Sequence, residues 1–170
     1  MMAVKLWINA SLKELKESGG FGARIIMEVN GKRLVWASCY IKQALSGLLA
    51  SIAYALDSCS AIPHVLGSFN EEDVNVVLRN CRDKEFIESF GTYEPLVTVV
   101  FRKIGGHLLI ESWENKKLVG REKVEIEEYV KAILEFLREY LEETDNEAYL
   151  TAFKRAEELA RLKQVEIFPK

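Results

Sequence analysis

The sequence predicts an α+β domain with a mainly antiparallel sheet built from hairpins, against which two or three helices pack. The first observation is a hairpin signal, because Asn30-Gly31 stands between two apolar runs and both residues tolerate the positive φ of a type I′ turn. The second is an internal similarity, since residues 22–35 align without a gap to residues 106–119 at an offset of 84. The third is an amphipathic helix pattern that follows each of these segments.

These observations together predict a repeated β-β-β-α unit. The helical patterns continue the alignment after a slip of one residue, and their matching apolar positions are Leu45, Leu48, Leu49, Ile52 and Leu56 against Val130, Ile133, Leu134, Leu137 and Leu141. The repeat halves would cover 1–60 and 93–143 within a single domain of 170 residues, closed by a helix over 145–163. A coincidence of hydrophobic periodicity remains the alternative, because any two hairpin-plus-helix units share such a pattern.

The first half begins with a strand over residues 2–9 and a short helix over 11–16, which the glycine pair at 19–20 ends. The hairpin follows, and its turn should place Glu28 opposite Arg33 and Ile26 opposite Val35. We expect the first long helix at 41–58. The segment 63–70, rich in turn residues, is predicted to be a loop and the most mobile part of the chain.

In the middle of the chain, residues 74–78 read as a short strand, and 83–90 fit either a helical turn or a strand. The second β set should run over 96–123, with turns at Gly105-Gly106 and Glu114-Asn115. A helix is expected at 125–142, where acidic residues in the first turn complement the helix dipole. Thr144-x-x-Glu147 has the form of a capping box and would open the last helix. The apolar tail 165–169 could add an edge strand or dock on another copy.

The composition excludes several classes of protein. The formal net charge is −3 and the pI about 5.6, which give no overall attraction to phosphate backbones or acidic membranes. No apolar run is long enough for a bilayer and no secretory signal is evident, so we expect a cytoplasmic protein with no membrane partner. Cys39, Cys59 and Cys81 show no metal-ligand spacing and are predicted to be reduced thiols. The scarcity of glutamine hints at a thermophilic source.

The segments Lys5-Leu6-Trp7-Ile8-Asn9-Ala10-Ser11 and Gly19-Gly20-Phe21-Gly22-Ala23, with the start of the helix at 41, resemble the opening of a ribonuclease HI domain. The resemblance covers about residues 4–57. It implies, as an alternative to the α+β prediction, a ribonuclease-H-like α/β fold. Such enzymes hold two divalent cations with clustered carboxylates, which activate water and stabilise the leaving oxygen.

The acidic positions that this resemblance implies are mostly lost. Asn9 stands at the first one, Gly47 near the helix position and Asn80 at a third, and only Glu157 could serve as the last. One carboxylate cannot hold two magnesium ions. If the fold is of this type, the resemblance therefore implies a degenerate, non-catalytic member.

A candidate binding surface lies on the second β set. Trp113 alternates with His107 and Glu111, which places it on the polar face of its strand, and basic side chains follow at Lys116, Lys117, Arg121 and Lys123. Aromatic and basic groups on one sheet face can stack bases and contact phosphate. Tryptophan also anchors protein interfaces, so cover by the last helix or by a twin subunit is the alternative.

These patterns predict a non-catalytic cytoplasmic binding domain, with no catalytic residues, metal site or cofactor. Its partner is expected to be a protein or a second copy of the chain. The alternative is a nucleic-acid-binding pseudoenzyme related to ribonuclease H. A third hypothesis is an enzyme with an unrecognised site around Asn9, Asn80 and Glu157.

Overall fold

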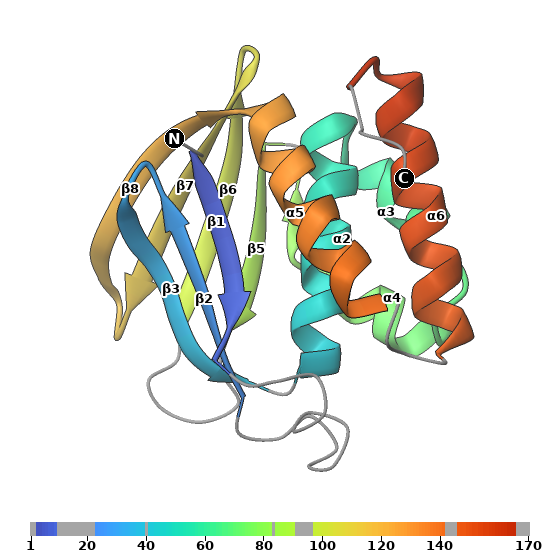
Figure 1. Ribbon diagram of the computed structural model, residues 1–170, viewed down its shortest axis with the longest axis horizontal. Coiled ribbons are helices and arrows are strands. Elements are labelled where there is room, and N and C mark those ends of the chain that lie inside the picture. Colours follow the sequence, from blue (N-terminus) through green and yellow to red (C-terminus); the bar gives the residue numbers. More distant parts are fainter. Residues whose placement is uncertain are drawn as a thin grey trace.

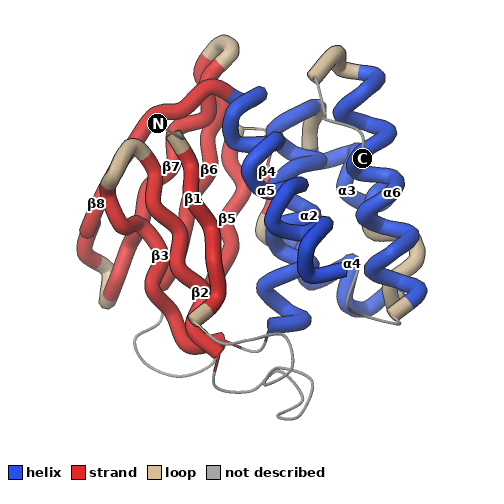
Figure 2. Tube along the Cα trace, viewed as in Figure 1, coloured by secondary structure: helices blue, strands red, loops and turns tan. Residues whose placement is uncertain are grey.

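The computed structural model describes residues 3–9, 23–39, 41–82, 84–90, 97–141 and 146–165. The strands gather on one side of the molecule and the helices on the other (Figure 1, Figure 2). All recorded strand pairs are antiparallel. The predicted α+β class is therefore confirmed. The expected short helix at 11–16 and most of the apolar tail fall outside the described residues.

The strands form two sheets. Sheet A has the order β1-β2-β3, with β1 at Val4–Ile8, β2 at Ala23–Val29 and β3 at Lys32–Cys39. Sheet B has the order β4-β5-β6-β7-β8, and its strands are Cys81–Arg82, Glu85–Phe90, Val97–Ile104, His107–Glu114 and Lys117–Glu125. The uncertain segment at 83–90 is thus a strand from 85 to 90. Strand β3 lies across sheet B and contacts β5, β6, β7 and β8.

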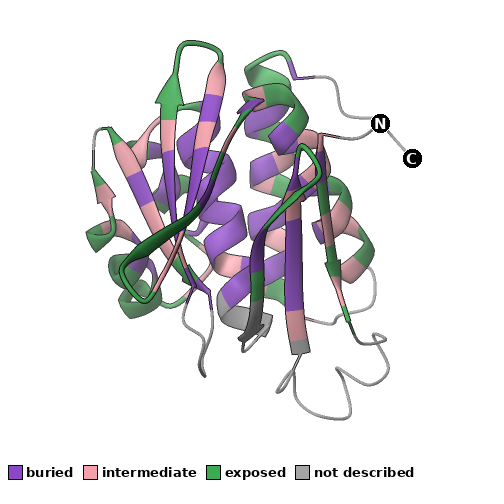
Figure 3. Cartoon of the chain, turned by 90° about the vertical axis from the view of Figure 1, so that its left-hand side faces the viewer, coloured by how far each residue is buried: buried purple, intermediate pink, exposed green. Residues whose placement is uncertain are grey.

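The helices are α2 at Ile41–Leu56, α3 at Ile62–Val65, α4 at Glu71–Arg79, α5 at Ile126–Leu141 and α6 at Glu147–Leu162, with a 3-10 helix η1 at Cys59–Ala61. Helix α2 has no charged residue from Ala44 to Leu56 and packs against α5, α6 and β5. A helix of this composition belongs in a core. Its described residues from 47 to 56 are all buried, and buried residues gather where the sheets face the helices (Figure 3). None of the described helices is long and apolar enough to cross a membrane.

The order β-β-β-α occurs twice. Strands β1, β2 and β3 precede α2, and β6, β7 and β8 precede α5; the two helices have 16 residues each and are offset by 85. Each second hairpin turns on two residues of positive φ, Asn30-Gly31 in one unit and Asn115-Lys116 in the other. The second turn is therefore one residue later than predicted.

A β-bulge makes the first hairpin differ from its predicted register. Glu28 lies opposite Arg33 as expected, but the irregularity between Met27 and Glu28 pairs Met27 with Val35 and Ile26 with Trp36. The prediction that Ile26 faces Val35 was wrong for this reason. The second unit has its own irregularity between Ser112 and Trp113, at the equivalent position. Bulges are not visible in hydrophobic alternation, because they add one residue to one strand only.

Two segments of the middle region are helical where the sequence suggested otherwise. The expected loop at 63–70 overlaps α3 over its first three residues and is non-helical from 66 to 70, and the expected strand at 74–78 belongs to α4. The side chain of Asn70 caps α4 by accepting from the backbone N–H of Glu72 at 2.8 Å. Val74 and Val77 are the buried residues of α4, and their spacing is that of a helix stripe. The last helix is likewise capped by Asn146, which precedes the observed start at Glu147.

Cys59 and Cys81 form a disulfide between η1 and the start of β4. The prediction that these two thiols are reduced was wrong. Their sequence separation of 22 residues says nothing about proximity. The chain brings them together because α3 and α4 make an excursion and return to the edge of sheet B.

Candidate functional site

Two exposed tryptophans lie on the face of sheet A that points away from the core. The register aligns Trp7, Ile26 and Trp36 across the three strands, a set we call the tryptophan row. Trp7 is 37% exposed and Trp36 is 49% exposed, whereas Ile26 beneath them is 4% exposed. The opposite face of the sheet carries the buried Val4, Ile25 and Met27. Sheet A therefore presents indole rings to solvent that its own core does not need.

Two arginines flank Trp36. Along the strands, the tryptophan row lies between the row that contains Arg24 and the row that contains Arg33. The guanidinium carbon of Arg24 lies 5.0 Å from the centre of the Trp36 ring, and that of Arg33 lies 5.2 Å from it. Both distances are within the range of cation–π attraction. The indole therefore holds two cations in place while their N–H groups stay available to a ligand.

Few negative charges offset these cations. Arg33 reaches Glu28 at 3.8 Å, a long and partly exposed ion pair that contributes little. Arg24 forms no ion pair with any described residue. Lys5 is exposed in the same row as Glu28 and Arg33. This face is thus locally basic on a chain of net negative charge.

Asn9 helps to position Arg24. Its side-chain oxygen accepts from the backbone N–H of Arg24 at 2.8 Å, and its own backbone N–H donates to the Arg24 carbonyl at 3.1 Å. These two bonds extend the pairing of β1 with β2 past the end of β1. The asparagine that occupies the first degenerate acidic position therefore orders the backbone that carries one of the two stacked arginines.

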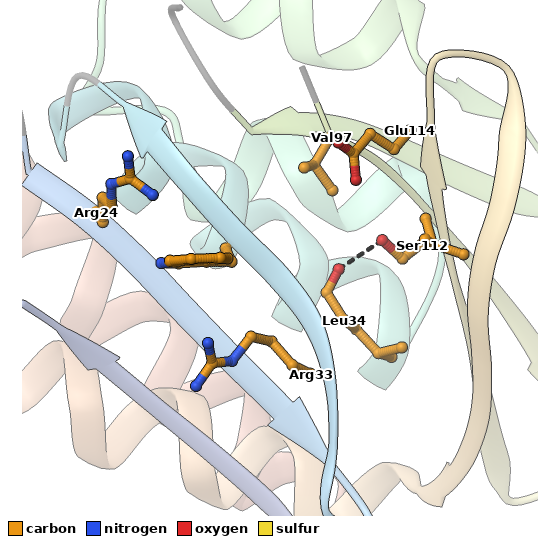
Figure 4. Close-up of a pocket in the computed structure, with 8 residues that line it drawn as sticks. Arg24, Arg33, Leu34, Val97, Ser112 and Glu114 are labelled. Atoms are coloured by element: carbon orange, nitrogen blue, oxygen red, sulfur yellow. Dashed lines mark hydrogen bonds between the residues drawn. The ribbon is translucent and has the colours of Figure 1, made fainter. Parts of the chain in front are cut away.

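A cavity of about 340 Å³, which we call the corner pocket, lies where β3 meets the inner face of sheet B. Its lining residues are Arg24, Arg33, Leu34, Trp36, Val97, Ser112, Glu114 and Val119. Figure 4 shows the two arginines on one side of β3, with Val97, Ser112 and Glu114 on the other. This volume falls in the range of small-ligand sites.

Sheet B contributes one fixed and one unpaired polar group to the corner pocket. The hydroxyl of Ser112 donates to the Leu34 carbonyl at 2.5 Å and so joins the two sheets. Its donor is used, which leaves only acceptor capacity for a ligand. The carboxylate of Glu114 forms no hydrogen bond or ion pair with the described residues. The pocket therefore offers two guanidinium groups, an indole ring and one free carboxylate.

The surface predicted from the sequence lies elsewhere, on sheet B. The register of β7 and β8 puts His107, Trp113, Arg121 and Lys123 on the face opposite the core, with Trp113 half-buried and Lys123 exposed. Lys116 and Lys117 are exposed at the β7–β8 turn. The fold therefore gathers these six residues along one hairpin. It does not bring them to the tryptophan row.

Arg121 is already paired on that surface. Its guanidinium reaches Glu111 at 2.6 Å, and Arg102 reaches the other oxygen of the same carboxylate at 2.7 Å. Burial opposes ionisation of Glu111, but the hydrogen bond from Arg121 and the charge of Arg102 outweigh it and lower the pKa of the carboxyl. Arg102 also binds Glu85 at 3.1 Å. Arg121 is therefore a weaker candidate for an external anion than Arg24.

The four degenerate acidic positions do not assemble into a metal site among the described residues. Glu157 is bound by Arg138 at 2.5 Å, and Asn80 follows the end of α4. The described part of the chain contains no group of three or more His, Cys, Asp or Glu side chains that could hold a metal ion. Gly47 leaves space in α2 for the side chain of Glu88.

Glu88 points inward from β5 and packs against Gly47 of α2. A Cβ at position 47 would lie 2.6 and 2.8 Å from the two carboxylate oxygens. The described residues give this carboxyl no hydrogen-bond partner, and burial raises its pKa to about 8. Burial raises the pKa of Tyr129, and Glu88 raises it further. The Tyr129 hydroxyl is hydrogen-bonded to the Ser51 hydroxyl at 2.6 Å. A partly buried carboxyl group with a raised pKa therefore fills the space that glycine leaves open in the core helix.

We expect Gly47→Ala to destabilise the protein by about 1–3 kcal/mol, because overpacking outweighs the gain in helix propensity of about 1 kcal/mol. Urea unfolding of the single and double variants measures this effect. In a Glu88→Ala background the same substitution should become neutral or stabilising, since the clash is gone. Equal destabilisation in both backgrounds would contradict the close approach of Glu88 to Gly47.

Sequence reasoning missed Trp7, Trp36, Arg24 and Arg33. The signal that was available is that Trp7 alternates with Lys5 and Asn9, which marks a polar face. Trp36 carries no comparable signal, because the bulge shifts it by one residue relative to a regular hairpin. Comparisons with protein-family models, with curated proteins and with solved structures found no match. The resemblance to ribonuclease H accordingly stays a prediction.

Proposed function

We propose that this chain is a non-catalytic binding domain for single-stranded nucleic acid and that its binding surface is the outer face of sheet A. The observation that carries the proposal is the pair of exposed tryptophans flanked by Lys5, Arg24 and Arg33. Aromatic rings stack on bases of any sequence, and cations beside them contact the phosphates. Both groups are needed together, and sheet A supplies both.

Single-stranded nucleic acid fits the outer face of sheet A better than a duplex does. Sheet A presents its rings on a broad strand face, whereas a base pair in a duplex hides its planes within the stack. Stacking is worth about 1–3 kcal/mol per base. The exposed Trp7 ring and the two guanidinium groups that lie over Trp36 can therefore support measurable affinity even though the whole chain has a net charge of −3.

We expect Arg24→Ala/Arg33→Ala to weaken binding of a labelled single-stranded oligonucleotide in fluorescence anisotropy. The slope of log affinity against log salt should also fall by about 1 to 1.5, because two phosphate contacts are lost at about 0.7 each. Trp36→Ala should weaken binding with little change in that slope. DNA and RNA strands are compared in parallel, since the 2′-hydroxyl is what distinguishes them.

The matched control is Lys154→Ala/Arg161→Ala, which removes two exposed positive charges from α6, away from sheet A. It should retain the parent's affinity and salt slope. A third variant, Lys116→Ala/Lys117→Ala, tests the surface on sheet B. If Lys116→Ala/Lys117→Ala loses binding and Arg24→Ala/Arg33→Ala keeps it, the site lies on β7 and β8 and the assignment to sheet A is wrong.

A second candidate function is self-association through β8. This strand ends sheet B in the described order, and its Leu118 and Val119 are 41% and 54% exposed. Exposed apolar side chains on an edge strand favour pairing with another chain. Light scattering that shows a strict monomer at high protein concentration would remove this candidate.

A further inference from the structure

The corner pocket has a feature that phosphate binding does not use. Phosphate and stacking require the cations and the indole, but the carboxylate of Glu114 lines the same cavity and repels any anion. No ion pair joins it to Arg24 or Arg33 among the described contacts. Glu114 is therefore a cost to a surface that binds phosphate alone, unless the ligand carries a donor for it.

One nucleotide unit carries all of the complementary groups. It has an anionic phosphate for the guanidinium groups, a planar ring for the apolar side chains of Val97 and Val119 and, in some bases, an exocyclic amino group. Carboxylates of Asp and Glu accept from the N4 amino group of cytosine. Bases of single strands are read by such hydrogen bonds once they are splayed out. We infer that the corner pocket receives one base of the bound strand and selects a base with an exocyclic amino group through Glu114; this inference rests on the proposed function.

The geometry supports selection at this position. Glu114 is the last residue of β7 and is paired on both sides, with Val97 of β6 and Lys117 of β8. The neighbouring Ser112 is locked to Leu34 of β3, so the two walls of the cavity are joined. Val97 and Val119 provide apolar surface for the rest of the ring. A carboxylate that projects from this paired backbone discriminates by donor, because a base with a carbonyl oxygen in that place would leave the carboxylate unpaired.

Cytosine and uracil provide the sharpest comparison, since their rings have nearly the same shape and differ at position 4, where one has an amino group and the other a carbonyl oxygen. The parent protein should bind short oligo(dC) more tightly than oligo(dU) by about 5-fold to 100-fold in anisotropy. Glu114→Gln should reduce this ratio several-fold, mainly by improving the binding of oligo(dU), because the amide also donates. Glu114→Ala should bring the ratio close to one.

The control is Glu125→Gln, which makes the same charge change at the end of β8, on the outer face of sheet B. It should leave the ratio of the two affinities unaltered. The assays distinguish failure of strand binding from failure of base selection by Glu114. Failure of the parent to bind any strand removes the proposed function and this inference with it. Binding that depends on Arg24 and Arg33 but is equal for both homopolymers, or a ratio that Glu114→Gln does not change, overturns the inference alone.

Discussion

Glu88→Gln should make the protein more stable than the parent at alkaline pH, and the difference should vanish in acid. The pKa of the Glu88 carboxyl is raised from 4.5 to about 8 by burial. In the folded state it stays protonated across this window, whereas in the unfolded chain it ionises above about 4.5. The folded state therefore binds more protons, and the stability of the parent falls as the pH rises between these two values. Glutamine has nearly the same shape and no titration.

The effect is large because each unit of pKa shift corresponds to about 1.4 kcal/mol. The stability difference between Glu88→Gln and the parent should grow across the window to a maximum of a few kcal/mol and stay constant above pH 8, because Glu88 is only partly buried and solvent reduces the cost of its charge. Urea unfolding of both proteins from pH 4 to 9 measures it, and subtraction cancels the other titrating groups. A constant difference over the whole range would show that Glu88 ionises as easily in the folded state as in the unfolded chain.

Reduction of the Cys59–Cys81 disulfide should cost about 3 kcal/mol. The bond closes a loop with a sequence separation of 22 residues, and the chain-entropy argument for a loop of this length gives that figure. Helices α3 and α4 lie inside the loop, so their attachment to α2 and β4 should weaken first. Unfolding in urea with and without a reducing agent measures the change.

The matched variant is Cys59→Ser/Cys81→Ser, which should resemble the reduced parent and should not respond to the reducing agent. A parent that is equally stable with and without reductant would contradict the disulfide. Disulfides persist in oxidising compartments and also inside hyperthermophilic cells. The cytoplasmic location and the thermophilic source therefore stay predictions. A lasting disulfide in the cytoplasm is expected only if the source is a hyperthermophile.

The sequence predicted the order of elements well because that order depends on local patterns. Asn30-Gly31 set the first hairpin, and the apolar spacing set α2 and α5 to within a few residues. The same patterns failed at Val74 and Val77, where two valines suggested a strand although their spacing and the Asn70 cap belong to a helix. Strand propensity of β-branched residues was overruled by capping and burial.

The sequence predicted one candidate surface, and the structure carries a second one. An aromatic ring among basic residues on a sheet face was expected around Trp113, and the structure offers a more exposed set around Trp36. Contacts such as Arg24 over Trp36, or Ser112 on Leu34, join residues through the pairing of strands and sheets. The Arg24–Trp36 contact depends on the register that the bulge sets, and the Ser112–Leu34 contact depends on the packing of the two sheets. Neither is encoded in the spacing of residues along the chain.

The two β-β-β-α units use the equivalent position of their middle strand differently. Ile26 and Glu111 each stand one residue before the bulge of their unit, and each is the middle of a three-strand row. In the second unit the row is Val100, Glu111 and Arg121, where the chain neutralises its own charge by an internal ion pair. In the first unit the row keeps two indoles and a neighbouring arginine without such closure. The charges of the row in the second unit are thus neutralised within the chain, whereas Arg24 of the first unit forms no ion pair with a described residue.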